Sequence, residues 1–169
     1  MAKVDWHKFD AAPSYTPGGG GLISTAADYR RFARMLLQGG KFGGTRFLRR
    51  ETVELMRTNR LTPDQRMIPF ARMPLWRTNG FGLGVSLAEN RADNPYACGA
   101  PGSMTWPGIF GTWWQADPIN DLAMIYLIQH QVPVSAGLGA TIATGRGAAR
   151  RRALPIFQHG IYGSLSPEG

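Results

Sequence analysis

The chain has 169 residues, of which 43% are hydrophobic, and it carries a formal net charge of +8. This length fits one domain with a sizeable core, and this composition excludes a disordered or fibrous protein. No apolar run approaches the roughly 20 residues that span a bilayer, so we expect no membrane span.

The ends of the chain give little information about location or partners. The first ten residues contain four charges and no apolar stretch, so we do not expect a signal peptide, and the compartment stays open. Cys98 is the single cysteine, which excludes an internal disulfide or a cysteine-based metal site. The only dense basic cluster is Arg146 with Arg150–Arg152. Without an aromatic platform or recognition helix beside it, this cluster indicates a solvated basic face and disfavours nucleic acid as a partner.

The strongest helix signal follows the four glycines 18–21. Thr25 has the side chain of an N-cap, and Asp28 occupies the third helical position, as in a capping box. Apolar residues then recur with helical spacing, namely Tyr29, Phe32, Ala33 and Leu36. Gly39-Gly40 is predicted to end this helix.

A second, shorter helix is predicted over residues 51–57, because that segment is acidic at its start and basic at its end. Residues 58–79 are rich in proline and methionine, and we interpret them as an excursion outside the core.

Three strands are predicted next. In residues 81–87, bulky residues alternate with glycine and serine, and the bare face suits close approach by a helix. After a loop over 88–103, residues 109–116 are predicted to form the second strand. Residues 117–121 have the composition of a turn. Residues 122–128 form an apolar run, which predicts a strand over 122–129 that is buried on both faces.

A closing helix is predicted over 154–165, with Pro155 in its first turn. The fold class is therefore α+β, with an antiparallel sheet of about three strands, flanking helices and a C-terminal helix. We expect a single partial domain over 1–169, with helices and loops in 1–80, strands in 81–129, and a loop and helix in 130–169. Because so small a sheet leaves apolar surface uncovered, we expect a homo-oligomer or a complex with a complementing chain.

Nucleophile motifs are missing from the sequence. It contains no Ser-x-x-Lys, no Lys-Thr-Gly and no Gly-x-Ser-x-Gly. The glycine-rich runs do not complete a dinucleotide-binding fingerprint, and the histidines lack metal-ligand spacing. We therefore expect no metal and no other cofactor. The histidines are His7, His130 and His159.

Three blocks of sequence are nevertheless recognisable by their order and spacing. They are Gly19–Leu22 with Ser24–Ala26 and Asp28-Tyr29, then Gly80–Val85, then Trp106–Gly108 with Gly111-Thr112 and Asp117-Pro118. Together they resemble the C-terminal half of the serine β-lactamase and penicillin-binding-protein-like family, especially class C β-lactamases and family VIII carboxylesterases. The resemblance implies a partial β-lactamase/transpeptidase-like fold.

The resemblance also implies a divided active site. In that family an acyl-enzyme forms on the serine of Ser-x-x-Lys, a tyrosine assists proton transfer, and both lie N-terminal to the region that this chain resembles. The chain holds only the third element, a Trp-x-Gly motif in which Trp106 and Gly108 match the first and last positions. Trp106, Pro107 and Gly108 would then contact the substrate, and the backbone N–H of Ile109 would donate to the oxyanion.

Pro107 departs from the glycine or threonine that is commoner at the middle position of the motif. Proline cannot donate to a strand ladder, which is acceptable at a sheet edge. It also removes a hydroxyl contact to a substrate carboxylate, and this favours ester chemistry over β-lactam hydrolysis.

Three hypotheses remain open at this stage. The chain is part of a serine esterase or β-lactamase-like hydrolase that acts on a small ester or amide, or a non-catalytic remnant or assembly domain of the same fold, or an arginine-rich module for anionic surfaces. For the motif itself, the alternative is that Trp106, Trp113 and Trp114 are core aromatics and that Gly108 forms a bulge.

Overall fold

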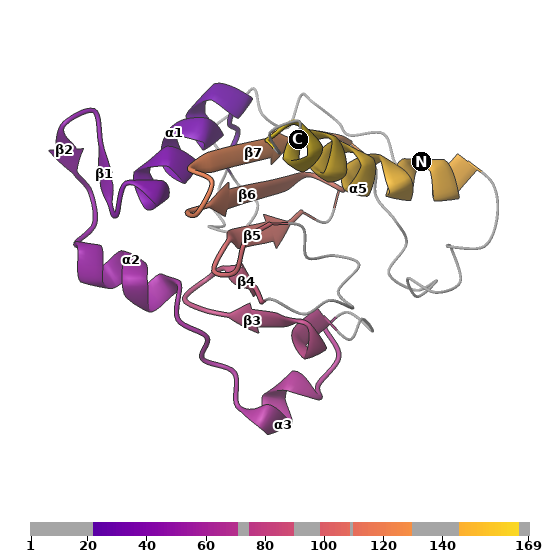
Figure 1. Cartoon of the computed structure of the whole chain (residues 1–169), viewed down its shortest axis with the longest axis horizontal. Coiled ribbons are helices and arrows are strands. Elements are labelled where there is room, and N and C mark those ends of the chain that lie inside the picture. The colour runs from indigo at the N-terminus through magenta and orange to yellow at the C-terminus, as the bar shows by residue number, and fades with distance from the viewer. Residues whose placement is uncertain (1–21, 71–74, 90–98, 109, 130–145, 166–169) are drawn as a thin grey trace, which may run out of the picture.

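Helices packed on an antiparallel sheet make up the protein, as the resemblance predicted (Figure 1). The computed structural model describes residues 22–70, 75–89, 99–108, 110–129 and 146–165, and of residues 146–152 it describes the backbone alone. The expectations for the glycines 18–21, Cys98, Ile109, His130 and the first part of the 130–169 segment lie outside these residues.

Helix α1 (Ala26–Leu37) begins and ends where the sequence predicts. The Thr25 side chain accepts a hydrogen bond from the Asp28 backbone N–H over 3.2 Å, as an N-cap does. At the other end, Gly39 and Gly40 adopt φ angles of +60° and +89°, a left-handed conformation that glycine adopts without strain.

A small hairpin and a second helix follow α1. Strands β1 (Lys41–Phe42) and β2 (Thr45–Arg46) pair with each other around a two-glycine turn, a hairpin that the sequence pattern did not predict. Helix α2 (Arg50–Met56) confirms the predicted shorter helix to within one residue at each end.

The predicted excursion contains two short helical pieces, α3 (Pro63–Arg66) and the 3₁₀-helix η2 (Leu75–Arg77). A capping box starts α3, because Thr62 and Gln65 exchange side-chain to backbone hydrogen bonds. The excursion is not wholly outside the core, since Trp76 in η2 is only 9% exposed. Burial of this large apolar side chain stabilises the fold and holds the proline-rich segment around it against the sheet.

The main sheet has five strands in chain order, and each pairs antiparallel with the next. They are β3 (Asn79–Phe81), β4 (Ser86–Ala88), β5 (Met104–Pro107), β6 (Trp113–Asp117) and β7 (Leu122–Tyr126).

Two of the predicted strand boundaries were wrong. The segment 81–87 is not one strand but a hairpin, in which the Gly82 N–H donates to the Val85 carbonyl and Gly84 adopts a φ of +76°. The second strand does not cover 109–116, because the chain reverses over 108–112 and separates β5 from β6. Glycines that we interpreted as a bare strand face serve as turn residues.

The close helix approach that we predicted for this segment does occur at Gly82. A Cβ atom there would overlap the backbone carbonyl of Met56, the last residue of α2. Glycine at this position therefore lets the end of α2 pack directly against the β3–β4 turn.

Strand β7 is shorter and less buried than the predicted doubly buried strand over 122–129. Only Met124 is fully buried, because β7 lies at the edge of the sheet among the described strands. Ala123 and Ile125 pack on the apolar core, and Tyr126 contacts Phe157 of the C-terminal helix with ring centroids 5.4 Å apart.

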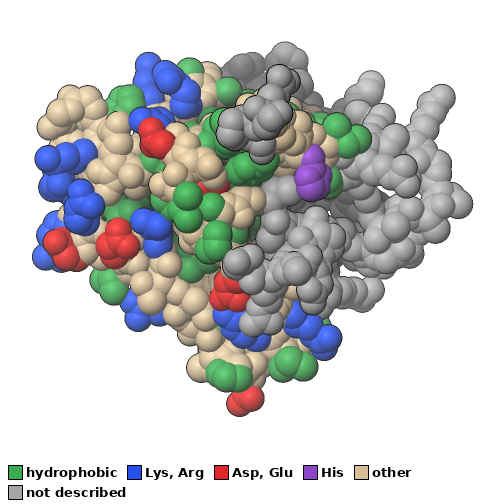
Figure 2. Space-filling model, viewed as in Figure 1, with side chains coloured by type: hydrophobic (Ala, Val, Ile, Leu, Met, Phe, Trp, Pro, Cys, Tyr) green, Lys and Arg blue, Asp and Glu red, His purple; other side chains and the backbone are tan. Residues whose placement is uncertain are grey.

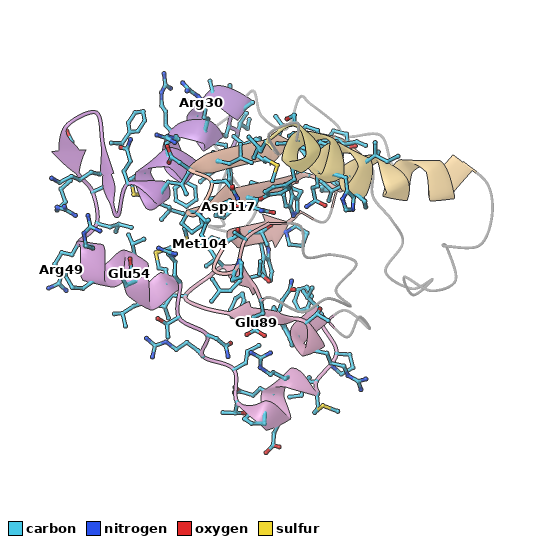
Figure 3. All side chains as sticks on the ribbon, viewed as in Figure 1. Arg30, Arg49, Glu54, Glu89, Met104 and Asp117 are labelled. Carbon is cyan, nitrogen blue, oxygen red and sulfur yellow. The ribbon has the colours of Figure 1, made fainter. Side chains whose placement is uncertain are left out.

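One face of the sheet packs against α1 and α2. The rings of Tyr29 and Phe32 on α1 lie 5.8 Å and 5.6 Å from that of Trp114 on β6. Met104, which is labelled in Figure 3, is fully buried in this core. The buried members of the core are Ala33, Met35, Leu36, Val53, Val85, Leu87, Met104, Trp114 and Ala116.

Helix α5 (Arg146–Leu165) contacts the sheet through Phe157 and Tyr162. It starts at Arg146 and not at Leu154 as predicted, so Pro155 lies inside it and not in its first turn. The alanines around the arginine cluster are strong helix formers, and they extend the helix N-terminally despite the backbone donor that Pro155 lacks.

The carboxylate of Asp117 at the end of β6 joins three parts of the chain. It accepts hydrogen bonds from the backbone N–H groups of Ile119 and Asn120 in the predicted turn, and from the Asn120 side chain. It also accepts from the Ala100 N–H over 3.1 Å and from the Tyr162 hydroxyl over 2.6 Å. The turn, the loop before β5 and α5 are thus held by one fully buried side chain.

Burial raises the pKa of Asp117, but the hydrogen bonds from Tyr162, Asn120 and Ala100 outweigh it and hold this pKa below its usual value. The charged carboxylate therefore stabilises the folded chain above the unfolded pKa of about 3.9. That contribution disappears as the pH falls through the lower, folded pKa.

We therefore expect the free energy of unfolding to fall as the pH is lowered from about 5 to about 2. Asp117→Asn should be less stable near neutral pH and should show a flatter pH dependence, because its side chain does not titrate. Urea unfolding at a series of pH values measures both quantities. Asp64→Asn, an exposed change on α3 outside this network, is the control and should keep the wild-type slope.

Candidate active-site edge

The Trp106–Gly108 motif lies where β5 changes from an interior strand to an edge. Met104 and Thr105 are paired with both β4 and β6. Trp106 and Pro107 are paired with β6 only, because β4 begins at Ser86 and the chain turns away before it. Pro107 occupies this one-sided part of the strand, where its missing N–H leaves no gap in a second ladder.

Gly108 closes the turn between β5 and β6. Its N–H donates to the Thr112 carbonyl over 2.7 Å, and its carbonyl accepts from the Gly111 N–H over 3.0 Å. A Cβ atom at Gly108 would overlap the hydroxyl oxygen of Thr112, so the missing side chain makes room for that threonine. Ile109, the predicted oxyanion donor, lies outside the described residues.

The indole of Trp106 belongs to a group of four rings, which we call the aromatic wall: Phe70, Trp76, Phe81 and Trp106. Trp76 stacks on Trp106 with an interplanar angle of 23° and centroids 6.3 Å apart. Phe81 and Phe70 lie 5.4 Å and 5.5 Å from Trp106 at tilted or edge-on angles. Trp113 and Trp114 are buried core residues, whereas Trp106 is half-buried.

Hydrogen bonds and an ion pair anchor the excursion, which carries Phe70 and Trp76, to the sheet. Arg66 forms a two-pronged ion pair with Glu89, which follows β4, and it also donates to the Trp76 carbonyl. The Asn59 side chain accepts from the Phe81 N–H, and the Arg60 N–H donates to the Phe81 carbonyl over 2.8 Å. The aromatic wall is therefore tied to β3 and β4 by hydrogen bonds as well as by packing.

Exposed apolar side chains lie in the two turns at this end of the sheet. In an antiparallel meander, the β3–β4 and β5–β6 turns share one end, and they carry Leu83 and Phe110, which are 49% and 41% exposed. Phe70 on the aromatic wall is 37% exposed. Two shallow hollows of the described surface lie elsewhere, along α2 and beside α3.

The serines that the structure describes are all engaged with backbone carbonyls. Their hydroxyls donate as follows: Ser24 to Thr25, Ser86 to Gly80, Ser103 to Ala100 and Ser164 to Ile161. No described serine is hydrogen-bonded to a lysine or histidine base, which an activated nucleophile requires. The described residues also include no group of three His, Cys, Asp or Glu side chains that could hold a metal ion.

The positive charge is dispersed on the visible face of the protein. Figure 2 shows Lys and Arg side chains on this face with acidic side chains among them. The side chains of Arg146 and Arg150–Arg152, which form the dense basic cluster, lie outside the described part of the chain. Across the parts of the chain that the structure describes, no helix has the length and apolar composition needed to cross a bilayer.

Sequence reasoning identified Trp106 but missed the rings around it. Phe70 and Trp76 stood in the proline- and methionine-rich excursion, and the ion pair between Arg66 and Glu89 joins residues 23 positions apart. Two aromatic residues in an otherwise irregular segment were the available signal, since large aromatic side chains are costly to leave in water.

Known proteins match this chain over most of its sequence. The sequence model of the beta-lactamase family matches residues 2–147. "Uncharacterized protein MT1414" and "Protein Rv1367c", from two strains of Mycobacterium tuberculosis, are each 45% identical over 156 residues and cover 90% of this chain. The chain spans 39% of the length of these curated relatives.

Solved structures share the fold. "EstCE1, a hydrolase with promiscuous acyltransferase activity" superposes with a TM-score of 0.57 at 24% identity, covering 85% of this chain and 32% of that one. Unliganded "Simvastatin Synthase (LovD)" from Aspergillus terreus, as its selenomethionyl derivative, gives 0.56 at 24% identity, covering 89% and 39%. At this identity the likeness establishes the partial β-lactamase/transpeptidase-like fold.

The overlap at Gly108 gives a test of the turn. Gly108→Ala should lower the free energy of unfolding by about 1–3 kcal/mol, as overpacking does. Adding Thr112→Ala should recover much of that loss, because the side-chain atom that overlaps the new Cβ is removed. Adding Thr112→Val should not, because a methyl group then takes the place of the hydroxyl. Urea unfolding of the single and double variants measures this coupling. Equal losses in both double variants would show that Thr112 is not the obstacle.

Proposed function

The chain belongs to the beta-lactamase family, and on that premise we propose that it supplies the substrate-facing strand and oxyanion donor of a serine hydrolase. The nucleophilic serine, its lysine and the assisting tyrosine would come from a further segment or a complementing chain. The observation that carries this proposal is the one-sided pairing of β5 at Trp106 and Pro107, which leaves backbone open at the motif.

The oxyanion donor follows from the hydrogen bonds of the turn. Because the N–H and carbonyl of Gly108 are both used inside the turn, neither is available to a substrate. The next backbone N–H along the chain is that of Ile109, and we propose that it donates to the developing oxyanion. A fixed donor of this kind stabilises the charge that forms on the carbonyl oxygen during acyl transfer.

Small esters are the substrate class that we propose. Trp106 would offer an apolar surface to an acyl or alcohol group, and Pro107 offers no hydroxyl to a carboxylate. Phe110, two residues after the motif, adds an exposed apolar side chain. These features support ester chemistry over hydrolysis of an anionic β-lactam.

The alternative is a non-catalytic member of the same fold that serves in binding or assembly. The described serine hydroxyls donate to backbone carbonyls. This agrees with both proposals, because neither of them places the nucleophile on a described serine of this chain. The two proposals differ in what happens when the missing catalytic residues are supplied.

We predict that the purified chain alone does not hydrolyse p-nitrophenyl butyrate above the buffer rate and is not labelled by a fluorophosphonate. A chimera in which this chain replaces the matched region of Protein Rv1367c should do both, because it restores the remainder of the fold. Initial rates and gel-based labelling measure the two properties. Unmodified Protein Rv1367c serves as the reference.

Stoichiometric labelling of the chain alone would overturn the proposal, because it would place a nucleophile within these residues. A folded chimera that stays unlabelled while Protein Rv1367c is labelled would favour the non-catalytic alternative.

In the active chimera, Trp106→Ala should raise KM for bulky esters more than it lowers kcat, as expected when a side chain binds substrate and transition state equally. Phe47→Ala is the matched control, because Phe47 is 63% exposed between β2 and α2, away from the motif. Steady-state kinetics on p-nitrophenyl esters of increasing size tests this. A loss confined to kcat would assign Trp106 a different role.

A further inference from the structure

Phe70 and Trp76, both from the predicted excursion over 58–79, contribute two rings to the aromatic wall, and we propose that this wall binds a neutral aromatic group of the substrate. The inference rests on the proposed function, since it names the class of ester that the same site would take. Phe70 and Trp106 would contact the ligand, while Trp76 and Phe81 are positioning residues that hold the Trp106 ring.

The four rings differ in how much of each is exposed to solvent. Trp76 is 9% exposed and lies behind the group, Trp106 and Phe81 are half-buried, and Phe70 is 37% exposed. An aromatic group that approaches from solvent would therefore meet ring surface at Phe70, next to Trp106. The ring of Phe70 lies 5.5 Å from that of Trp106 on the motif strand.

The wall is held in place before a ligand arrives. Arg66 ties the excursion to Glu89 and to the Trp76 carbonyl, and Asn59 ties it to the backbone of Phe81. Rings that are already fixed lose little conformational freedom on binding, so more of the contact energy appears as affinity.

The charge around the wall selects the kind of ligand. The guanidinium of Arg66 is matched by the carboxylate of Glu89, so this cation is already neutralised beside the rings. Ring faces and edges attract another aromatic group through offset or edge-to-face contacts, which aliphatic groups do not reproduce. The geometry therefore points to an ester with an uncharged aromatic acyl or alcohol part.

Binding of 2-naphthol to the purified full chain tests this without any catalysis. Ligand-observed saturation-transfer NMR and a titration give its affinity, with cyclohexanol as the aliphatic comparison. We expect 2-naphthol to bind and cyclohexanol to bind at least severalfold more weakly. Phe70→Leu should weaken 2-naphthol binding roughly three- to tenfold, because it keeps an apolar side chain but removes the ring.

Phe47→Leu is the matched control, since it makes the same change at an exposed phenylalanine away from the wall, and it should leave the affinity unchanged. Phe70 is partly exposed, so Phe70→Leu should remain folded, and circular dichroism checks this. No binding of 2-naphthol, equal binding of cyclohexanol, or equal losses in the two variants would each overturn the inference. These readouts do not depend on the chimera, so failure of the proposed function would be seen separately.

Discussion

The hydrogen bonds to the carboxylate of Asp117 join three parts of the chain that lie far apart in the sequence. Ala100 precedes β5, Asn120 belongs to the β6–β7 turn, and Tyr162 lies near the end of α5. Gln115 extends this network, since its side chain donates to the same tyrosine hydroxyl over 2.6 Å. A buried charge is tolerated only when it is hydrogen-bonded, so the need to satisfy this carboxylate favours the observed positions of the loop before β5 and of α5.

The position of the candidate site follows from that placement. Once β5 begins at Met104 and β4 begins at Ser86, their overlap is too short to cover the motif. The same strand is then interior at one end and open at the other. Thr105, on the interior part, is buried and donates its hydroxyl to the Trp114 carbonyl, while Pro107 is exposed. A rigid strand with one open end is a suitable support for an acyl-transfer site, because the backbone there cannot shift freely.

The sequence predicted what depends on neighbouring residues and missed what depends on distant ones. The start of α1 was predictable because Thr25 and Asp28 form a local cap, and the turn at Asp117 because its residue types prefer turns. The β3–β4 hairpin was missed because alternating glycines fit a strand pattern as well as a turn. Within the candidate site, Trp106 was found through a local motif, whereas the ring of Trp76 reaches it only through tertiary packing, which no spacing encodes.

The order of the strands has a consequence for how the chain folds. Since every strand of the main sheet pairs with its neighbour in sequence, the sheet has low contact order, and the β3–β4, β5–β6 and β6–β7 hairpins can form without closing long loops. The contact between Tyr162 and Asp117 is different, because it spans 45 residues. We therefore expect the meander to assemble early and α5 to dock last. Opening of that final contact would release the helix while leaving the five strands paired, so slow hydrogen exchange should persist longest in the amides of β5 and β6.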